Sequence, residues 1–294
     1  MSLLLAHLSD AHIGPLPRPQ KRELLGKRLT GYLNWTRGRH LVHDMEALRR
    51  LVADLKAQRP GHVAMTGDIL NIGLKAEFPP ARSWLETLGS PDDVSFVPGN
   101  HDAYVRSALP YLASTFAPWT TSDSGIAGFP YLRVREGVAL IGLSSAIPTA
   151  PLFASGRAGA AQLAAAADLL REAGRDGLIR VVLIHHPPDP GGAKFGRGLS
   201  DAAAFAALIR RLGAELVLHG HNHKLSVRHL PGPARQVPVI GVASASAVHG
   251  LAEHRASYNL FKIEGSPKSP QIRGQVRGLL PGGREVGELR PIAL

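Results

Sequence analysis

Short apolar runs alternate with helical repeats of apolar positions along most of the chain. Alternating or continuous apolar runs predict strands, and these cover residues 3–8, 62–66, 94–97, 131–134, 138–143, 179–184 and 215–218. Apolar positions three and four apart predict helices, and these cover residues 41–58, 77–88, 160–173 and 201–211. Strands that alternate with helices are typical of an α/β protein.

The last part of the chain has a different pattern. From Leu225 onward, β-like runs are separated by Gly and Pro, which predicts that the chain ends in a mostly antiparallel sheet. The sequence contains no internal repeat and no linker of domain-separating composition. We therefore predict a single domain over residues 1–294, with loop insertions at residues 13–40, 103–130 and 187–200.

The amino-acid composition indicates which partners are favoured and which side chains could hold a metal. Lys and Arg number 34 against 23 Asp and Glu, which gives a net charge of +11. This balance favours anionic partners such as phosphate esters, nucleic acid or an acidic membrane surface, although a merely basic surface would have the same charge. The chain has no Cys, so a metal would have to be held by His and carboxylate side chains.

The sequence does not predict a leader or a membrane-spanning helix. The apolar run after Met1 lacks the basic start and the cleavage site of a signal peptide. The Ala-rich stretch 158–173 is interrupted by polar side chains and reads as an amphipathic helix. We therefore expect a cytoplasmic protein whose contact with a membrane, if any, is peripheral.

Five polar motifs follow five of the predicted strands. They are Asp10-Ala11-His12, Gly67-Asp68, Gly99-Asn100-His101-Asp102, His185-His186-Pro187 and Gly220-His221-Asn222-His223. Because the carboxyl ends of strands in open α/β sheets converge on the ligand crevice, we expect these motifs to meet. Each motif alone could be an ordinary turn or a packed histidine. Together they deliver carboxylate, amide and imidazole groups to one edge.

This donor set suits two adjacent divalent transition metals. Imidazole combined with carboxylate favours Zn, Mn, Fe, Co or Ni over Ca, which prefers oxygen ligands, and we expect Mn, Fe or Zn. The candidate metal ligands are Asp10, His12, Asp68, Asn100, His185, His221 and His223. Asp68 could bridge the two cations, and two carboxylates leave a pair of dications with surplus positive charge, which favours a phosphate anion.

The ordered motifs D-x-H, GD, GNHD, H and GHNH resemble those of the calcineurin-like metallophosphoesterase superfamily over residues 10–223. The resemblance implies an α/β fold in which two mixed β-sheets pack as a sandwich flanked by helices, in four layers. It implies one metal held by Asp10, His12, Asp68 and His223, and another held by Asp68, Asn100, His185 and His221. It favours His185 over His186 as the ligand, which leaves His186 a structural role. It also implies that His101 contacts the phosphate and protonates the leaving oxygen, with Asp102 as the orienting partner of His101.

The implied function is hydrolysis of phosphate esters, with phosphodiesters favoured, by a water that two metals activate. A pyrophosphatase acting on a nucleotide-linked lipid such as UDP-diacylglucosamine is an alternative, although its best-known branch has Arg where this chain has His101. A nuclease fits the positive charge, but the chain lacks room for a large DNA-capping domain. A non-catalytic scaffold on the same fold would be expected to lack ligands, whereas all seven are present here.

Two further groups of residues lie outside the motifs. Residues 18–39 are strongly basic, with interleaved Tyr32, Leu33 and Trp35 and only Glu23 opposing. Because this segment follows the strand that carries Asp10, we predict a substrate lid that could touch an anionic membrane; the alternative is a solvated loop or short helix. We predict that His7, His62 and His219, which fall in or at the ends of strands, are packed side chains and not ligands. The sequence leaves the oligomeric state open.

Overall fold

Two six-stranded sheets form the centre of the protein in a computed structural model that describes residues 2–294. The first sheet has the order β12-β11-β10-β1-β2-β3 and the second has the order β4-β5-β6-β7-β9-β8. The strands are β1 (Ser2–Leu8), β2 (His62–Met65), β3 (Val94–Phe96), β4 (Tyr131–Arg135), β5 (Val138–Gly142), β6 (Ile179–Leu183), β7 (Leu216–His219), β8 (Ser226–Pro231), β9 (Gln236–Gly241), β10 (Ser257–Ser266), β11 (Ser269–Leu279) and β12 (Val286–Ile292). Both sheets contain parallel and antiparallel neighbours, which confirms the predicted pair of mixed sheets.

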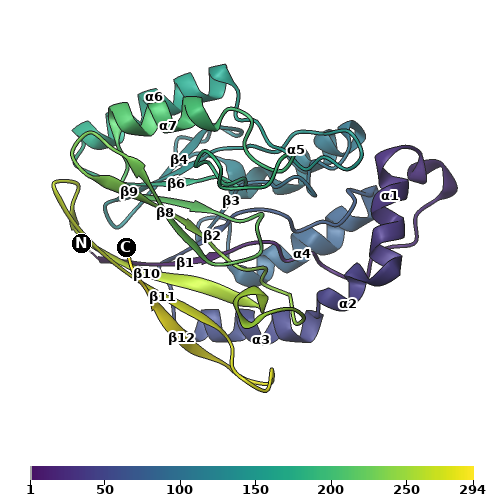
Figure 1. Cartoon of the computed structure of the whole chain (residues 1–294). Helices are drawn as coiled ribbons and strands as arrows, with labels where there is room; N and C mark the ends of the chain where they lie inside the picture. The colour runs from purple at the N-terminus through teal and green to yellow at the C-terminus, as the bar shows by residue number, and fades with distance from the viewer. Residues whose placement is uncertain (1) are drawn as a thin grey trace.

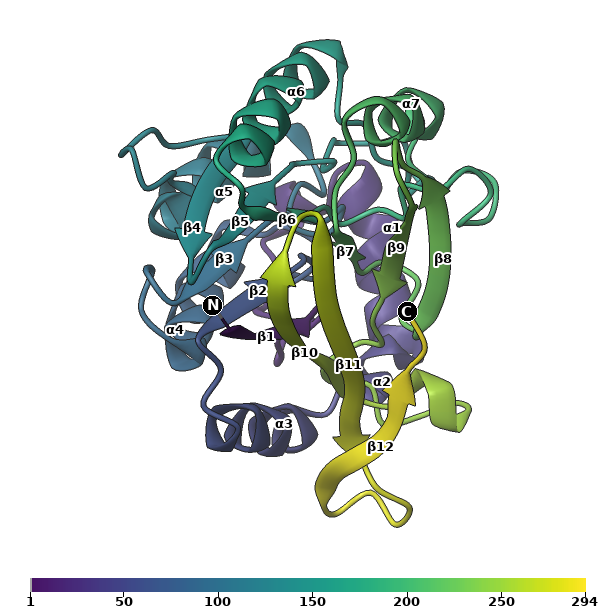
Figure 2. The same ribbon diagram turned by 90° about the vertical axis from the view of Figure 1, so that its left-hand side faces the viewer.

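Helices cover the outer faces of the two sheets (Figure 1). They are α1 (Lys27–Asn34), α2 (His40–Val42), α3 (Met45–Ala57), α4 (Phe78–Leu88), α5 (Leu109–Phe116), α6 (Ala160–Arg175) and α7 (Ala202–Leu212). Viewed along the sheets, α6 and α7 lie outside the second sheet and α3 lies outside the first (Figure 2). Within residues 2–294, no helix is long and apolar enough to cross a membrane.

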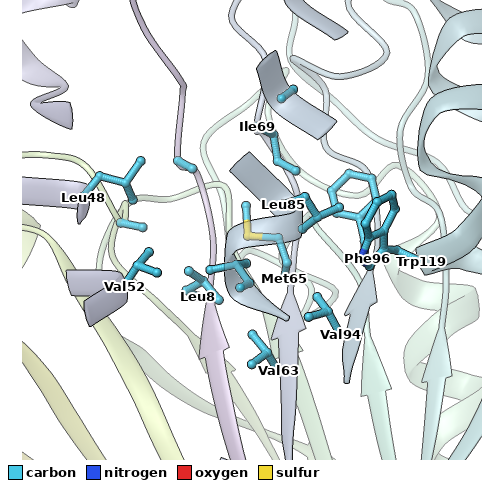
Figure 3. Close-up of a cluster of buried hydrophobic side chains, with 14 of the residues drawn as sticks. Leu8, Leu48, Val52, Val63, Met65, Ile69, Leu85, Val94, Phe96 and Trp119 are labelled. Carbon is cyan, nitrogen blue, oxygen red and sulfur yellow. The ribbon is translucent and has the colours of Figure 1, made fainter. Parts of the chain in front are cut away.

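Three apolar cores separate these four layers. The middle core lies between the sheets and includes Leu5 of β1 and Leu183 of β6. A second core packs the first sheet against α3, α4 and α5 and includes Met65 and Phe96 (Figure 3). The third core packs the second sheet against α6 and α7. Strands of both sheets therefore share one continuous middle core.

Strand β1 shows why its sequence is a continuous apolar run. Leu3 and Leu5 point into the middle core, whereas Ala6 and Leu8 point into the core beneath the first sheet. Side chains alternate between the faces of a strand, so a strand buried on both faces must be apolar at successive positions. β1 is parallel to β2, and β2 is parallel to β3. Their carboxyl ends therefore share one edge of the sheet.

The helix predicted over residues 41–58 is wrong at its start. The helix begins at Met45, because Asp44 has an extended backbone and its side chain accepts a hydrogen bond from the Ala47 N–H at 2.7 Å. This is the geometry of an N-terminal helix cap. The preceding short turn, His40–Val42, is a separate helix in which Leu41 is exposed.

The prediction of one mostly antiparallel sheet at the end of the chain is only partly right. The pairs β8–β9, β10–β11 and β11–β12 are antiparallel, but they belong to different sheets. β8 and β9 extend the second sheet through the parallel pair β7–β9, and β10 joins the first sheet beside β1.

Two of the three predicted loop insertions contain helices. Residues 13–40 include α1 and a π-helical turn at Trp35–Arg39, and residues 103–130 include α5. Residues 187–200 contain no helix or strand. In Figure 1, α1 stands at the end of the molecule opposite both chain termini.

Candidate active site

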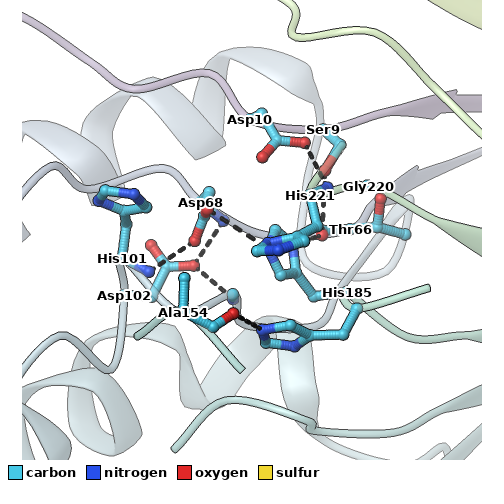
Figure 4. Close-up of polar contacts among 12 residues, drawn as sticks. Ser9, Asp10, Thr66, Asp68, His101, Asp102, Ala154, His185, Gly220 and His221 are labelled. Atoms are coloured by element: carbon cyan, nitrogen blue, oxygen red, sulfur yellow. Dashed lines mark hydrogen bonds and ion pairs between the residues drawn. The ribbon is translucent and has the colours of Figure 1, made fainter. Parts of the chain in front are cut away.

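The predicted ligands come together at the carboxyl ends of five strands. Asp10 and His12 follow β1, Asp68 follows β2, Asn100 follows β3, His185 follows β6, and His221 and His223 follow β7. Backbone hydrogen bonds tie these loops together, from Asp10 N to Gly67 O at 2.8 Å and from Gly220 N to His185 O at 3.0 Å. The site therefore lies where the two sheets meet, as the strand-end argument predicts (Figure 4).

Five of the seven candidate ligands have a left-handed backbone. The φ angles are 56° for Asp10, 41° for His12, 57° for Asp68, 70° for His221 and 52° for His223. This region is sparsely populated by residues with a side chain, and each such residue costs about 1–3 kcal/mol unless the surroundings enforce it. Backbone strain is therefore located at the residues that carry the donor atoms.

Two glycines are required by the close approach of these loops. Gly67 has a φ of 100°, and a Cβ there would lie 2.6 Å from Gly99 N. A Cβ at Gly99 would collide with the Asp68 carboxylate and the ring of His185. Since Asp68 and His185 belong to different sheets, the glycine before Asn100 lets both sheets approach the same point.

Backbone carbonyls orient two of the histidines. The Nδ1 atom of His12 lies 3.0 Å from Leu70 O, and that of His185 lies 2.6 Å from Thr66 O. A carbonyl accepts only, so Nδ1 must carry a proton in both histidines, and Nε2 is the ring nitrogen that faces the site. In His186, both nitrogens are occupied, by Ser145 Oγ at 2.7 Å and Ala154 O at 3.1 Å. This difference supports His185 as the ligand and a structural role for His186.

The donor atoms fit a binuclear metal centre. Ligand atoms lie within 4.8 Å of one another in four groups: Asp10 with His12 and His223, Asp10 with Asp68 and His185, His12 with Asp68 and His101, and His185 with His186 and His221. Within residues 2–294, two buried site atoms, Asn100 Oδ1 and His221 Nε2, have no hydrogen-bond partner. Two more, Asp10 Oδ1 and His185 Nε2, make no regular hydrogen bond and face only an ion-pair partner across the site. Unpartnered buried polar atoms are costly and rare, and bound metals would satisfy all four.

Ion pairs across the site perturb its carboxylates and histidines. His223 Nε2 lies 3.1 Å from Asp10 Oδ1, and His185 Nε2 lies 3.3 Å from Asp68 Oδ2. Burial alone would raise the pKa of Asp10 and of Asp68, but the neighbouring histidines lower both. Burial would lower the pKa of His185, whereas Asp68 raises it to about 9. Metals and protons would therefore compete for the same atoms.

His101 lies at the edge of this cluster. Its Nδ1 contacts the carbonyl of Asn71, and its backbone N–H donates to Asp68 Oδ1 at 2.7 Å. Burial and the nearby Arg39 lower the pKa of His101 to about 3. The free protein therefore holds a neutral imidazole with Nδ1 protonated and the Nε2 lone pair available.

Arg39 is a site residue that motif reasoning did not single out. Its guanidinium NH2 lies 3.0 Å from His12 Nε2, the same lone pair that a metal would use. The sequence indicates only that the segment 18–39 is basic, and Arg39 is one of its seven basic residues. His43, which also lies outside the five motifs, is buried beside His12 with ring centroids 4.6 Å apart, and its Nδ1 lies 2.8 Å from Ser246 Oγ.

Asp102 does not orient His101, which corrects the role expected from the motif. Among the hydrogen bonds of residues 2–294, none joins Asp102 to His101; its carboxylate instead accepts four backbone N–H groups, from Asp68 (2.7 Å), Ile69 (2.9 Å), Leu70 (3.0 Å) and Gly99 (2.8 Å). Burial and the charge of Asp68 raise the pKa of Asp102 to about 7, against the effect of the N–H donors. Asp102 therefore ties the Asp68 loop to the Asn100 loop.

The histidines predicted to be packed are buried and hydrogen-bonded. His7 Nε2 lies 2.9 Å from Thr66 Oγ1, His62 Nε2 lies 2.8 Å from Ser95 Oγ, and His219 Nδ1 lies 2.9 Å from Gly220 O. None of the three belongs to the four ligand groups found among residues 2–294.

The site opens into a polar cleft of about 650 Å³. Asp68, Asn100, His101, His221 and His223 form its floor. Its walls carry five further cationic side chains, Arg39, Lys194, Arg197, Lys224 and Arg228. Such a cleft suits an anionic substrate that must lie against the metal ligands.

Comparison with protein families agrees with this geometry. A family model described as calcineurin-like phosphoesterase matches residues 3–225, a range that includes every candidate ligand. Glycerophosphodiester phosphodiesterase GpdQ of Enterobacter lignolyticus is 33% identical over 119 residues, which are 38% of this chain and 36% of that protein. The match thus spans about a third of the length of that relative.

Solved structures share the fold at low sequence identity. A dimetal phosphatase from Danio rerio has a TM-score of 0.61 at 14% identity, over 98% of both chains. Purple acid phosphatase PPD1 from yellow lupin has a TM-score of 0.57 at 10% identity, over 99% of this chain and 54% of that one. The NAD nucleotidase of Haemophilus influenzae has a TM-score of 0.51 at 14% identity, over 98% of this chain and 54% of that one.

Proposed function

Because the chain belongs to the calcineurin-like phosphoesterase family, we propose that it is a metal-dependent hydrolase of phosphate esters and that phosphodiesters are its substrates. The observation that carries this proposal is the cluster of buried carboxylate, amide and imidazole donor atoms at the junction of the two sheets, of which Asn100 Oδ1 and His221 Nε2 have no partner. The partial likeness to a glycerophosphodiester phosphodiesterase supports the diester preference.

Seven residues are the proposed metal ligands. Asp10, His12, Asp68 and His223 would hold one metal, and Asp68, Asn100, His185 and His221 would hold the other. When bound, two divalent metals supply Lewis acidity toward water and toward the phosphate oxygens. The mixed nitrogen and oxygen donors favour Mn, Fe or Zn.

Arg39 and His101 are the proposed groups that act on the substrate itself. The lone pair of His12 Nε2 cannot serve a metal and Arg39 at the same time, so metal binding would free the guanidinium to contact the phosphate. His101, fixed through Nδ1 by the Asn71 carbonyl, would contact the ester with Nε2 and protonate the leaving oxygen. The proton would have to enter with the anionic substrate, because the free imidazole is neutral.

An assay of the Mn-loaded protein tests the reaction class and the substrate together. We expect turnover of bis-p-nitrophenyl phosphate to exceed that of p-nitrophenyl phosphate, with cyclic nucleotides and UDP-diacylglucosamine as further substrates in the same panel. Faster cleavage of UDP-diacylglucosamine than of any diester would replace our proposal with the pyrophosphatase alternative. Absence of turnover on the whole panel would favour a non-catalytic scaffold.

Replacing Asp68 tests the binuclear centre. Asp68 is the ligand common to both proposed metals, so Asp68→Asn should lower both metal content and turnover, with a loss of about 100-fold or more in activity. Elemental analysis should find two metals per chain in the wild type and fewer in the variant. Asp92→Asn, on the exposed surface, is the matched control. Unchanged metal content in Asp68→Asn would contradict the centre.

A further inference from the structure

Large apolar side chains are exposed around the mouth of the cleft. Leu25 is 77% exposed, Leu152 is 92% exposed and Phe195 is 98% exposed. Leu29 and Leu33, one turn apart on α1, are also exposed. These side chains come from three parts of the sequence, residues 18–39, 149–157 and 189–198, which we call the mouth face.

Direct contacts hold the three segments together. Lys27 Nζ donates to Phe153 O at 3.1 Å, which joins α1 to the second segment. Ala154 N donates to Gly196 O at 2.9 Å, which joins the second segment to the third. A second cavity of about 510 Å³ is lined by all three segments and also by Asn100 and His101. The mouth face is therefore continuous with the proposed metal site.

The exposed leucines of α1 are not needed to pack this helix. The inner side of α1 is formed by Lys27, which is buried with its ammonium 4.6 Å from the Tyr104 ring centroid. Gly31 lies one turn later, against Tyr104 and Ile72. Because Leu29 and Leu33 lie outside this contact, their apolar surface is left for a partner outside the fold.

The mouth face is also strongly basic. It contains ten Lys and Arg residues, of which seven lie in residues 18–39, one in residues 149–157 and two in residues 189–198. The opposing acids are Glu23 and Asp189. A surface that combines exposed apolar side chains with excess positive charge is complementary to an anionic lipid surface, where the apolar groups enter the headgroup region and the cations face the phosphates.

We propose that the mouth face binds an anionic lipid bilayer and turns the cleft toward the membrane. Single-stranded nucleic acid would use the positive charge, but its affinity comes from bases stacked on aromatic rings. Of the six exposed large apolar side chains of the mouth face, only Phe153 and Phe195 are aromatic, whereas Leu25, Leu29, Leu33 and Leu152 are aliphatic. Exposed aliphatic side chains gain free energy from lipid and none from a phosphate backbone. The exposed aliphatic side chains and the positive charge of the mouth face therefore both favour a lipid bilayer as its partner.

Membrane binding would select the substrates that reach the metals. Phosphate esters presented at a bilayer surface would enter the cleft directly, whereas the same ester in solution would gain no such advantage. This consequence for the substrate rests on the proposed hydrolase function, but the binding itself does not.

Sedimentation with vesicles tests the binding without reference to activity. The purified full chain should bind phosphatidylcholine vesicles with 30% phosphatidylglycerol at least 10-fold more strongly than pure phosphatidylcholine vesicles, and 0.5 M NaCl should weaken the binding. The triple variant Leu25→Glu, Leu29→Glu and Phe195→Glu should bind the anionic vesicles at least 10-fold more weakly. None of these three side chains lines either cavity, so hydrolysis of bis-p-nitrophenyl phosphate should stay within about twofold of wild type. Thermal melting confirms that the variant is folded.

The single variant Ile126→Glu is the matched control, because Ile126 is 70% exposed outside the mouth face. Equal vesicle binding by wild type and triple variant, or loss of binding in Ile126→Glu alone, would overturn the proposal. So would tighter binding of a fluorescent single-stranded oligonucleotide that the triple variant retains. Failure of the ester assay with vesicle binding intact would reject the hydrolase function and leave the lipid site standing.

Discussion

At the scale of single residues, each proposed carboxylate ligand has one oxygen committed to the protein. Asp10 Oδ2 accepts the His221 N–H at 3.0 Å, and Asp68 Oδ1 accepts the His101 N–H at 2.7 Å. The second oxygen of each carboxylate faces a histidine across the site. This division fixes the orientation of the carboxylates before a metal arrives, which is what second-layer hydrogen bonds do in metal sites.

His101→Ala should reveal whether the imidazole protonates the leaving oxygen. A general acid contributes about 10²–10⁴-fold for poor leaving groups and little for activated ones. We therefore expect a large loss of kcat on an alkyl phosphodiester and a much smaller loss on bis-p-nitrophenyl phosphate. His229→Ala, on the exposed surface, is the control. Equal losses on both substrates would assign His101 to phosphate binding alone.

Arg37 and Arg39 should behave differently although they are two residues apart. Arg39 reaches His12 in the cleft, whereas Arg37 is exposed and lines only the second cavity. Arg39→Ala should therefore raise KM for every ester, including bis-p-nitrophenyl phosphate, by roughly 10-fold, the worth of one charge-assisted hydrogen bond. Arg37→Ala should leave the small ester unaffected. Steady-state kinetics of the two variants on the same substrate decide the matter, and matching KM values would refute the assignment of Arg39.

At the scale of elements, the strands and most helices follow from local pattern, whereas contacts between distant segments do not. The two strands predicted over residues 131–134 and 138–143 form a hairpin, and Glu136 and Gly137 at its turn both have positive φ, 48° and 80°, as a tight hairpin requires. The true start of α3 depended on one capping side chain, Asp44, inside a run with helical periodicity. The periodicity of apolar positions alone could not choose between Leu41 and Met45 as the start of the helix.

The candidate site shows the same limit. The positions of the donor residues could be predicted because they follow strands. The partner of Asp102 could not, because the N–H groups it accepts lie mostly on another loop, more than 30 residues earlier in the chain. The contact of Arg39 with His12 could not be predicted for a similar reason, since no neighbouring residue distinguishes Arg39 from the six other cations in its segment.

Asp102→Asn should weaken the coupling between two loops without altering proton transfer. The amide has one acceptor oxygen in place of two, so some of the four backbone N–H groups would lose their partner. We expect metal affinity to fall about 10–100-fold and the melting temperature to fall, both measurable by metal titration and calorimetry. The dependence of rate on leaving group should match the wild type at saturating metal. A change in that dependence would restore the direct link to His101.

At the scale of the whole molecule, an ion pair holds the outer helical layer to the first sheet. Asp54 of α3 accepts Arg277 Nε at 2.9 Å and NH2 at 2.8 Å from β11, and the Tyr258 hydroxyl at 2.6 Å from β10. Burial would raise the pKa of Asp54, but Arg277 and Tyr258 lower it below its ordinary value. The charged carboxylate therefore stabilises the fold above the unfolded pKa of Asp, about 4.

Asp54→Asn should reduce the free energy of unfolding at neutral pH by about 1–3 kcal/mol, the usual worth of hydrogen bonds to a charged group. Since the folded pKa is lowered, this stabilisation is present above about pH 4 and is lost as the pH falls through the folded pKa. Urea unfolding at several pH values should therefore show a gap between wild type and variant that closes on acidification. Asp92→Asn serves as control, and a gap that persists or widens in acid would contradict this role of Asp54.

The placement of β1 between β2 and β10 has a consequence for the order of events during biosynthesis. Strand β1 leaves the ribosome together with Asp10 and His12, but its antiparallel neighbour, Ser257–Ser266, is made only after strands β2 to β9. Neither proposed metal shell is complete before His221 and His223 have emerged. Until β10 has been made, β1 can pair only with β2, and both proposed metal shells can be completed only after the loop that follows β7 has been made.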